Sequence, residues 1–175
     1  MIARILLPII AASSVAQAAD VTPMHQGLHQ WPALGGKLML VVGTYQDTVA
    51  YRRSYTFYFK EAKDETWYQA PVFNKKGLPE TEWNSASGGE TTLADGVVAA
   101  RPDGVYFITA DKKADRGYAE RGDITVTWNK LVTDDKDYPD GPTYLFKPSF
   151  TRSYPKSSLT VEAVLARELK AEPKK

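Results

Sequence analysis

Apolar and polar residues alternate along much of the middle of the chain. In the segment 54–60, every second position carries an aromatic residue, at Tyr55, Phe57 and Phe59. The segment 123–131 alternates in the same way, with apolar residues opposed to aspartate, threonine and asparagine. A period of two residues predicts strands with one dry face. Further segments suited to strands are residues 37–45, 66–73, 96–100, 104–110 and 143–150.

Turn-forming sequences separate these segments. They are rich in glycine, proline and aspartate, whose backbone preferences favour tight turns. Short strands at this spacing predict a mostly β fold, either an antiparallel sandwich or a barrel. The turn sequences are residues 87–89, 95–96, 102–104, 121–123 and 138–142.

The period changes near the C-terminus. In residues 157–170, apolar side chains recur at the three- and four-residue spacing of an amphipathic helix. Thr160 suits the N-cap, and Glu162 complements the helix dipole in the first turn. We therefore expect a short C-terminal helix, packed on a sheet through Val161, Val164, Leu165 and Leu169.

The first residues have the composition of a cleaved secretory signal peptide. Residues 1–18 contain one basic residue, Arg4, then a short apolar run, and end in Ala16-Gln17-Ala18. The run is shorter than the about 20 residues that a membrane-spanning helix needs. We therefore expect an exported protein that begins near Ala19 and lies in the periplasm, with secretion as the alternative. No membrane insertion is expected.

The remaining residues, 19–175, are expected to form a single domain. The chain has no cysteine, so in an oxidising compartment its core alone must hold the fold. A chain of about 157 residues buries roughly 70% of its unfolded surface, which is sufficient. Without Arg4, 21 basic residues balance 21 acidic residues. A nucleic-acid partner would favour a basic excess, so none is expected.

Both histidines, His25 and His29, lie close to the expected mature N-terminus. Thr22 and Pro23 could open a short N-terminal helix, on which the two imidazoles would share a face. A zinc site needs three or four ligands, however, and the chain has no cysteine and no further histidine. Gly27 also weakens such a helix. The sequence therefore predicts no metal site here, and the short helix stays open.

The acidic run from Asp134 to Gly141 is similar in composition to a calcium-binding loop. Such a loop has oxygen ligands at alternate positions, then glycine at the sixth position and glutamate at the twelfth. If Asp135 takes the first position, Pro139 occupies the fifth. The run therefore favours a solvated hairpin loop, and we expect neither a metal nor a cofactor.

The sequence Ser153-Tyr154-Pro155-Lys156 matches the Ser-x-x-Lys of penicillin-recognising enzymes. Those enzymes also carry Ser-Asp-Asn and Lys-Thr-Gly motifs, and neither occurs in this chain. Pro155 disfavours helical geometry at the residue before it. No nucleophile elbow and no phosphate-binding loop occurs either. The sequence therefore predicts no catalytic residue and no enzyme.

Four short motifs follow one another in the second half of the chain. They are Val105-Tyr106-Phe107, Gly141-Pro142-Thr143-Tyr144, Ser153-Tyr154 and Leu159-Thr160-Val161-Glu162-Ala163. With these motifs, residues 82–170 resemble the carbapenem intrinsic-resistance family of CarG-like periplasmic proteins. The resemblance implies a two-sheet antiparallel β-sandwich, akin to the fold of periplasmic inhibitors of invertebrate-type lysozyme. It also implies a homodimer and protection from a carbapenem without β-lactam hydrolysis.

Two departures from these families bear on function. CarG-like proteins carry an Asp-x-Asp-x-Asp-Gly stretch before the first long strand, whereas residues 31–37 here contain no aspartate. The resemblance therefore carries over no cation site. The lysozyme inhibitors act through a Ser-Gly-x-Tyr loop, and the nearest segment here, residues 103–106, has aspartate in place of serine.

Taken together, these observations predict an exported, non-enzymatic binding protein. Its expected partner is a small-molecule antibiotic or a cell-envelope protein. The alternative is a periplasmic inhibitor of a lysozyme or of another muralytic enzyme or toxin, and a metal-dependent enzyme comes third. A stable complex with a lysozyme would distinguish an inhibitor from a resistance protein. The sequence does not identify the residues that bind.

Overall fold

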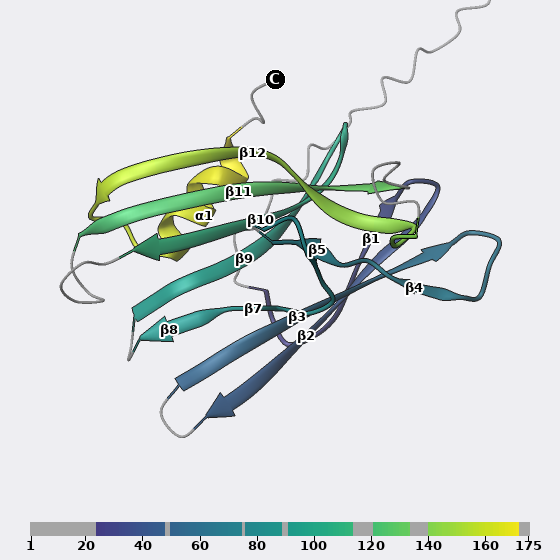
Figure 1. Ribbon diagram of the computed structural model, residues 1–175, viewed down its shortest axis with the longest axis horizontal. Helices are drawn as coiled ribbons and strands as arrows, with labels where there is room; N and C mark the ends of the chain where they lie inside the picture. The colour runs from purple at the N-terminus through teal and green to yellow at the C-terminus, as the bar shows by residue number, and fades with distance from the viewer. Residues whose placement is uncertain are drawn as a thin grey trace, which may run out of the picture.

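Two β-sheets and a helix form the described part of the chain. The computed structural model describes residues 24–47, 50–74, 76–88, 91–113, 121–133 and 140–171. The expected signal peptide, residues 1–18, and positions 134–139 of the acidic run lie outside this part. The elements in Figure 1 are β1 (Gly27–Ala33), β2 (Gly36–Asp47), β3 (Ala50–Glu61), β4 (Trp67–Gln69), β5 (Val72–Phe73), β6 (Pro79–Glu80), β7 (Trp83–Asn84), β8 (Ala86–Gly88), β9 (Thr91–Arg101), β10 (Gly104–Lys113), β11 (Gly122–Thr133), β12 (Tyr144–Ser157) and α1 (Val161–Lys170).

The first sheet is antiparallel. Its strand order is β1-β2-β3-β4, and β7 also pairs with β3. The two long strands β2 and β3 pair along their whole length, with Leu40 opposite Phe57. Because side chains alternate across a strand, this register turns Leu38, Leu40 and Val42 to the same face as the aromatic residues of β3. The predicted dry face of the segment 54–60 is confirmed.

The second sheet has the strand order β6-β5-β12-β11-β10-β9-β8. All its pairs are antiparallel except β12 with β5, where Phe146 lies opposite Val72. The sheet is curled like half of a barrel and faces the first sheet (Figure 1). The mostly β, two-sheet fold predicted from the sequence is therefore confirmed, with one parallel pair that the sequence did not indicate.

The chain passes from the first sheet to the second at Pro71. The backbone N–H of Ala70 donates to the carbonyl oxygen of Phe57 at 2.9 Å, whereas the N–H of Phe146 donates to the carbonyl oxygen of Pro71 at 2.8 Å. Pro71 has no N–H with which to continue pairing. The prediction of one strand over residues 66–73 is therefore wrong: this segment forms β4 in one sheet and β5 in the other.

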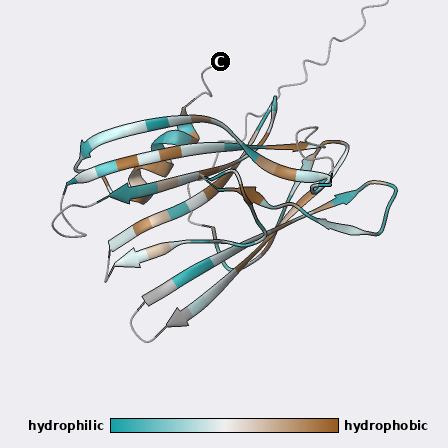
Figure 2. Cartoon of the chain, viewed as in Figure 1, coloured by the Kyte–Doolittle hydropathy of each residue, from teal (hydrophilic) through white to brown (hydrophobic). Residues whose placement is uncertain are grey.

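Aromatic side chains fill the space between the sheets. The ring of Phe57 contacts those of Phe107 and Phe146, with centroids 4.9 and 4.6 Å apart. Phe59 stacks on Tyr144 in the same layer. Figure 2 shows that apolar segments of both sheets gather in the middle of the molecule. The buried residues of this core are Leu38, Leu40, Val42, Tyr55, Phe57, Phe59, Ala70, Val72, Val105, Phe107, Leu131, Tyr144 and Phe146.

The helix α1 covers the opposite face of the second sheet, over β9 and β10. Thr160 caps it by accepting a hydrogen bond from the backbone N–H of Ala163 at 3.2 Å. No helix in the described ranges, α1 included, is long and apolar enough to cross a membrane. The predicted stripe of Val161, Val164, Leu165 and Leu169 is buried, which confirms both the helix and its docking on the sheet.

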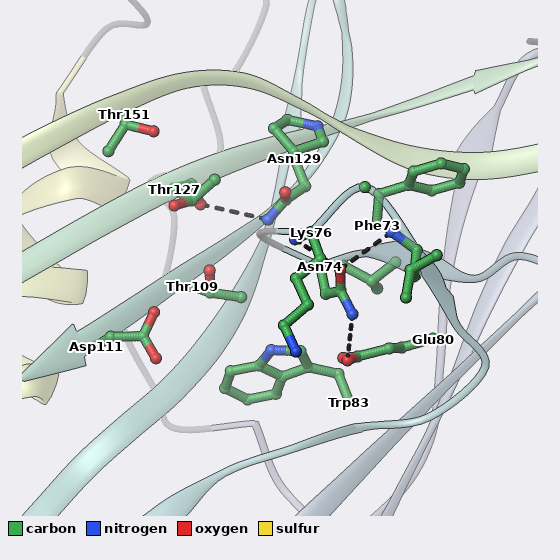
Figure 3. Close-up of a pocket in the computed structure, with 14 residues that line it drawn as sticks. Phe73, Asn74, Lys76, Glu80, Trp83, Thr109, Asp111, Thr127, Asn129 and Thr151 are labelled. Atoms are coloured by element: carbon green, nitrogen blue, oxygen red, sulfur yellow. Dashed lines mark hydrogen bonds between the residues drawn. The ribbon is translucent and has the colours of Figure 1, made fainter. Parts of the chain in front are cut away.

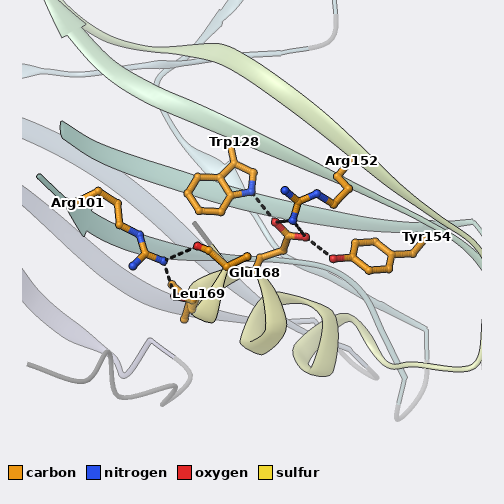
Figure 4. Close-up of polar contacts among 7 residues, drawn as sticks. Arg101, Trp128, Arg152, Tyr154, Glu168 and Leu169 are labelled. Carbon is orange, nitrogen blue, oxygen red and sulfur yellow. Dashed lines mark hydrogen bonds and ion pairs between the residues drawn. The ribbon is translucent and has the colours of Figure 1, made fainter. Parts of the chain in front are cut away.

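A buried carboxylate fixes this helix to the sheet. Glu168 has no exposed surface and accepts hydrogen bonds from Trp128 Nε1 at 2.8 Å and from Arg152 Nη1 at 2.8 and 2.9 Å. The hydroxyl of Tyr154 also donates to it (Figure 4). These donors replace the water that the carboxylate loses on burial.

The N-terminal part of the described chain is a strand. The sequence left open a short helix here, and that alternative is wrong. β1 pairs along its whole length with β2, with His29 opposite Leu40. Gly27 disfavours a helix, and hydrogen bonds between β1 and β2 satisfy the backbone N–H and C=O groups instead. Pro32 is tolerated because β1 is an edge strand.

Candidate functional site

A polar surface begins where the core between the sheets ends. On β10, Phe107 belongs to the core, and Thr109 and Asp111 follow on the same face because residues two apart in a strand point the same way. The register sets Thr109 opposite Thr127, and Thr127 opposite Thr151. Three neighbouring strands thus present a row of threonines beside the aromatic core.

This row lines a cavity of about 780 Å³, which we call the threonine groove. Small-molecule sites typically enclose about 300–1,000 Å³, so the volume is sufficient for a ligand. Figure 3 shows the threonines projecting from the strands of the second sheet, with Trp83 and the β5–β6 hairpin around them. The groove is defined by Thr109, Thr127 and Thr151 together with Asn74, Lys76, Glu80, Trp83, Asp111 and Asn129.

The β5–β6 hairpin forms one wall of the threonine groove. Asn74 organises its turn: the side-chain oxygen accepts from the backbone N–H of Lys76 at 2.8 Å and of Leu78 at 3.0 Å. The amide of Asn74 donates to Glu80 Oε1 at 2.9 Å. Gly77 completes the turn with a φ of 73°, a backbone conformation that favours glycine. The hairpin thereby holds Lys76 and Glu80 at the groove.

Trp83 forms an aromatic wall that the core supports. The side chain is half-buried, and its ring meets Tyr55 and Phe107 edge-on, with centroids 5.4 and 5.3 Å apart. At the inner end of the groove, Asn129 is 2% exposed and donates to the carbonyl oxygen of Phe107 at 3.0 Å. Both side chains are therefore fixed by the fold before any ligand arrives.

The charges at the threonine groove are mixed. Among its described lining residues, Lys76 is the one cation, and Glu80 and Asp111 are the carboxylates. Lys76 and Glu80 are exposed, whereas Asp111 is half-buried at the end of the threonine row. The excess of carboxylates makes the local potential less favourable for an anion than for a neutral ligand.

The Ser-x-x-Lys sequence lies on a strand. Ser153 is on β12 opposite Thr125 and is exposed. Lys156 follows near the end of β12 with a φ of 46°, and its backbone N–H donates to Asp123 Oδ1 at 2.8 Å. The helix begins only at Val161. Ser153 and Lys156 therefore do not share the helical turn on which penicillin-recognising enzymes present this pair.

The two histidines do not share a helical face. His25 is exposed and precedes β1, whereas His29 lies on β1 with its ring 6.0 Å from that of Trp31. His29 Nε2 is 2.7 Å from the backbone oxygen of His25. Within the described ranges, no three histidines, cysteines, aspartates or glutamates are grouped as a metal ion would require.

The segment nearest to the lysozyme-inhibitor loop is built into the sheet. Tyr106 is 3% exposed on β10, and its hydroxyl donates to Asp103 Oδ2 at 2.6 Å. Burial and this carboxylate raise the pKa of Tyr106 to about 12. A tyrosine held in this way is not available to reach into a partner.

The sequence did not identify the threonine groove as a site. Alternation assigned Thr127 and Asn129 to the polar face of their strand, without indicating that this face looks into a cavity. One signal was present: Leu131 is apolar on the face that carries Thr127 and Asn129, and Phe107 is apolar on the face that carries Thr109. A change from apolar to polar along one face marks the place where two packed sheets part.

The fold of the described residues defines the class of protein: a mostly antiparallel two-sheet β-sandwich with a helix packed on the outer face of the curled sheet. Among solved structures, the crystal structure of CarG is similar, with a TM-score of 0.68 and a sequence identity of 19% over 83% of this chain and 94% of the CarG chain. Neither a protein-family model nor a curated protein sequence matches the chain. The expected CarG-like fold is confirmed.

Proposed function

We propose that this protein is an exported binding protein of the CarG-like type, which protects the cell envelope from a carbapenem without hydrolysing it. The observation that carries the proposal is the fold shared with nearly the whole CarG chain. Residues 1–18 have the sequence pattern of a cleaved signal peptide, which supports export to the periplasm.

The chemistry of the threonine groove supports binding in place of catalysis. Its described lining contains threonines, amides, carboxylates, one lysine and the apolar residues Val72, Phe73, Leu78, Trp83 and Pro148, but no serine, cysteine or histidine. An acyl-enzyme route requires a nucleophile activated by a positioned base, with oxyanion donors nearby. The placement of Ser153 and Lys156 along a strand supports the same reading. Protection then comes from sequestering the drug or from shielding its target.

The first prediction is that the purified mature protein does not turn over a carbapenem. Loss of the ring absorbance should be no faster with the protein than with buffer, because no activated nucleophile is expected in the groove. Multiple turnovers that are abolished by Ser153→Ala or by a chelator would overturn the non-enzymatic proposal.

Deleting the gene tests the protective role directly. The deletion strain should become more sensitive to a carbapenem and regain resistance when the full chain is supplied. The same strains should be challenged with lysozymes. Sensitivity to a lysozyme alone, together with a stable complex between the two proteins, would show that the protein is a lysozyme inhibitor instead. The burial of Tyr106 disfavours that alternative.

A further inference from the structure

We propose that the threonine groove binds a neutral saccharide. This inference rests on the proposed function in one respect, which is that the groove is the working site of a binding protein. It names the ligand class that the groove takes, and it favours shielding of an envelope component over sequestration of the drug.

The row of threonines supplies hydroxyl groups at regular intervals. Thr109, Thr127 and Thr151 lie on adjacent strands in direct register, so their backbones are spaced about 4.8 Å apart. A threonine hydroxyl both donates and accepts hydrogen bonds. Sugar hydroxyls have the same dual character, so each contact can form in either direction. A repeated row of such groups suits a ligand with repeated hydroxyls.

Trp83 supplies the apolar surface that a sugar ring requires. The C–H groups on one face of a pyranose are weakly positive, and the face of an aromatic ring is negative, so the two attract. Tyr55 and Phe107 fix the indole from the core side at 5.4 and 5.3 Å. A wall already held in place lowers the entropy that binding costs.

The charges at the groove distinguish a neutral ligand from an anionic one. Carboxylates accept hydrogen bonds from sugar hydroxyls, and both Glu80 and Asp111 line the groove. A carbapenem carries a carboxylate, which these two groups would repel and which, among the described lining residues, only Lys76 can offset. Desolvating an ion also costs more than desolvating a hydroxyl. The groove therefore fits a neutral saccharide better than the drug.

The test titrates the mature full chain with three neutral trisaccharides and a carbapenem, followed by tryptophan fluorescence and calorimetry. The trisaccharides are triacetylchitotriose, cellotriose and maltotriose. Comparing the first two tests the effect of the N-acetyl group, and comparing the last two tests the effect of the linkage. We expect at least one to saturate the protein with a Kd tighter than about 5 mM. No saturable binding of any of them would overturn the inference, and so would tighter binding of the carbapenem in the groove.

Matched variants place the binding in the groove. Thr127→Val and Thr151→Val keep the shape of the side chain and remove one hydroxyl, so each should weaken binding about 5- to 10-fold. Thr56→Val makes the same change opposite Val41, on the outer face of the first sheet, and should leave the affinity unchanged. Unaltered affinity in both groove variants, or equal loss in Thr56→Val, would overturn the assignment.

The binding data, compared with the carbapenem sensitivity of the deletion strain, distinguish this inference from the proposed function. If no saccharide binds but the deletion strain is sensitive to the carbapenem, the ligand class is wrong and the protective role stands. If a saccharide binds through the threonines but deletion changes no sensitivity, the ligand class stands and the protective role is wrong. Thermal melting of each variant shows whether a loss of binding reflects a loss of folding.

Discussion

Glu168 is a carboxylate on the apolar stripe of α1. Its position continues the helical spacing of Val161, Val164 and Leu165, and it is as fully buried as they are. Among its hydrogen-bond donors, Arg152 also supplies a compensating charge at 2.8 Å. A charge buried in this way remains stable only while its partners are present. The helix is therefore fixed in rotation by a specific polar contact as well as by apolar burial.

Replacing Glu168 by alanine should lower the free energy of unfolding by about 3 kcal/mol. This value is at the lower end of the stability losses usual when one partner of a buried ion pair is removed. We expect the lower end because the side chain of Arg152 is 28% exposed and can be hydrated after the change. Urea denaturation gives the value. The double variant Glu168→Met with Arg152→Met should recover part of the loss, since neither charge is then unpaired. A loss below about 0.5 kcal/mol would contradict this account.

Tyr106 and Tyr144 predict a decline of stability in alkali. Each hydroxyl donates to a carboxylate, Asp103 or Glu61, and burial together with that charge raises both pKa values to about 12. An unfolded tyrosine has a pKa of about 10. The folded state therefore holds the protons more strongly, and its stability is full below about pH 10 and falls as the pH rises toward about 12.

Denaturation at a series of alkaline pH values, with tyrosinate absorbance recorded in parallel, checks this expectation. Tyr106→Phe should make the decline shallower, because one of the shifted groups is removed. A free energy of unfolding that stays constant from about pH 8 to about pH 12 would show that neither proton is held more strongly in the folded chain.

Among the elements, the β1–β2 hairpin has an unusual turn. Leu34 and Gly35 have φ values of 47° and 75°, as in the two-residue turn that favours Asn-Gly. A bulky side chain in this conformation costs about 1–2 kcal/mol. Leu34 is 50% exposed, so little burial offsets that cost.

Leu34→Asn should therefore raise the free energy of unfolding by about 1 kcal/mol, since asparagine adopts positive φ readily. Leu34→Ala is the control, because alanine has the same backbone cost as leucine and should bring no gain. Thermal or urea denaturation of the three proteins compares them. A gain as large in Leu34→Ala would mean that exposure of the leucine, and not its backbone, is responsible.

Elements with a strong local pattern were predictable from the sequence. β3, β11 and α1 follow the periodicity of residues 54–60, 123–131 and 157–170, where each element buries one continuous face. β1 and β5 were not. β1 is a largely exposed edge strand without a continuous buried face, so its alternation is weak. β5 has two residues and joins β12 across the second sheet, a relation that no local window contains.

The threonine groove could not be predicted for a related reason. The sequence assigns Thr109 and Thr127 to particular faces of their strands, but a cavity also requires the two sheets to part beyond Phe107. That depends on the curl of the second sheet and on where the hairpin carrying Asn74 lies. Both are properties of the assembled sandwich.

Across the whole molecule, polar contacts join the sheets at two separate points along β3. Tyr55 donates to Asp95 Oδ1 at 2.6 Å, and Arg53 pairs with Asp95 Oδ2 at 2.7 Å. Further along β3, Glu61 accepts from the hydroxyl of Tyr144 on β12. Asp95 is 3% exposed, so the hydrogen bonds from Tyr55 and Arg53 replace the water that its carboxylate loses on burial. The contacts fix how the sheets lie across each other, which apolar packing alone leaves less specific.

Tyr55→Phe should destabilise the protein by about 1–3 kcal/mol, because the ring is kept while the buried Asp95 loses a donor. Tyr45→Phe removes a hydroxyl from a residue that is 62% exposed and should change the stability by less than about 0.5 kcal/mol. Equal effects of the two changes, measured by urea denaturation, would show that the link between the sheets contributes little.

The pairing of β5 with β12 has a consequence for how the chain folds over time. Val72 precedes its partner Phe146 in the chain by a long stretch, so it is synthesised well before the strand that it pairs with. Contacts between such distant residues form slowly, because a long loop must close first. A growing chain therefore cannot complete its second sheet before its C-terminal strand emerges. If the protein is exported as proposed, this delay leaves the second sheet incomplete, and the polypeptide without its full fold, until β12 has been made.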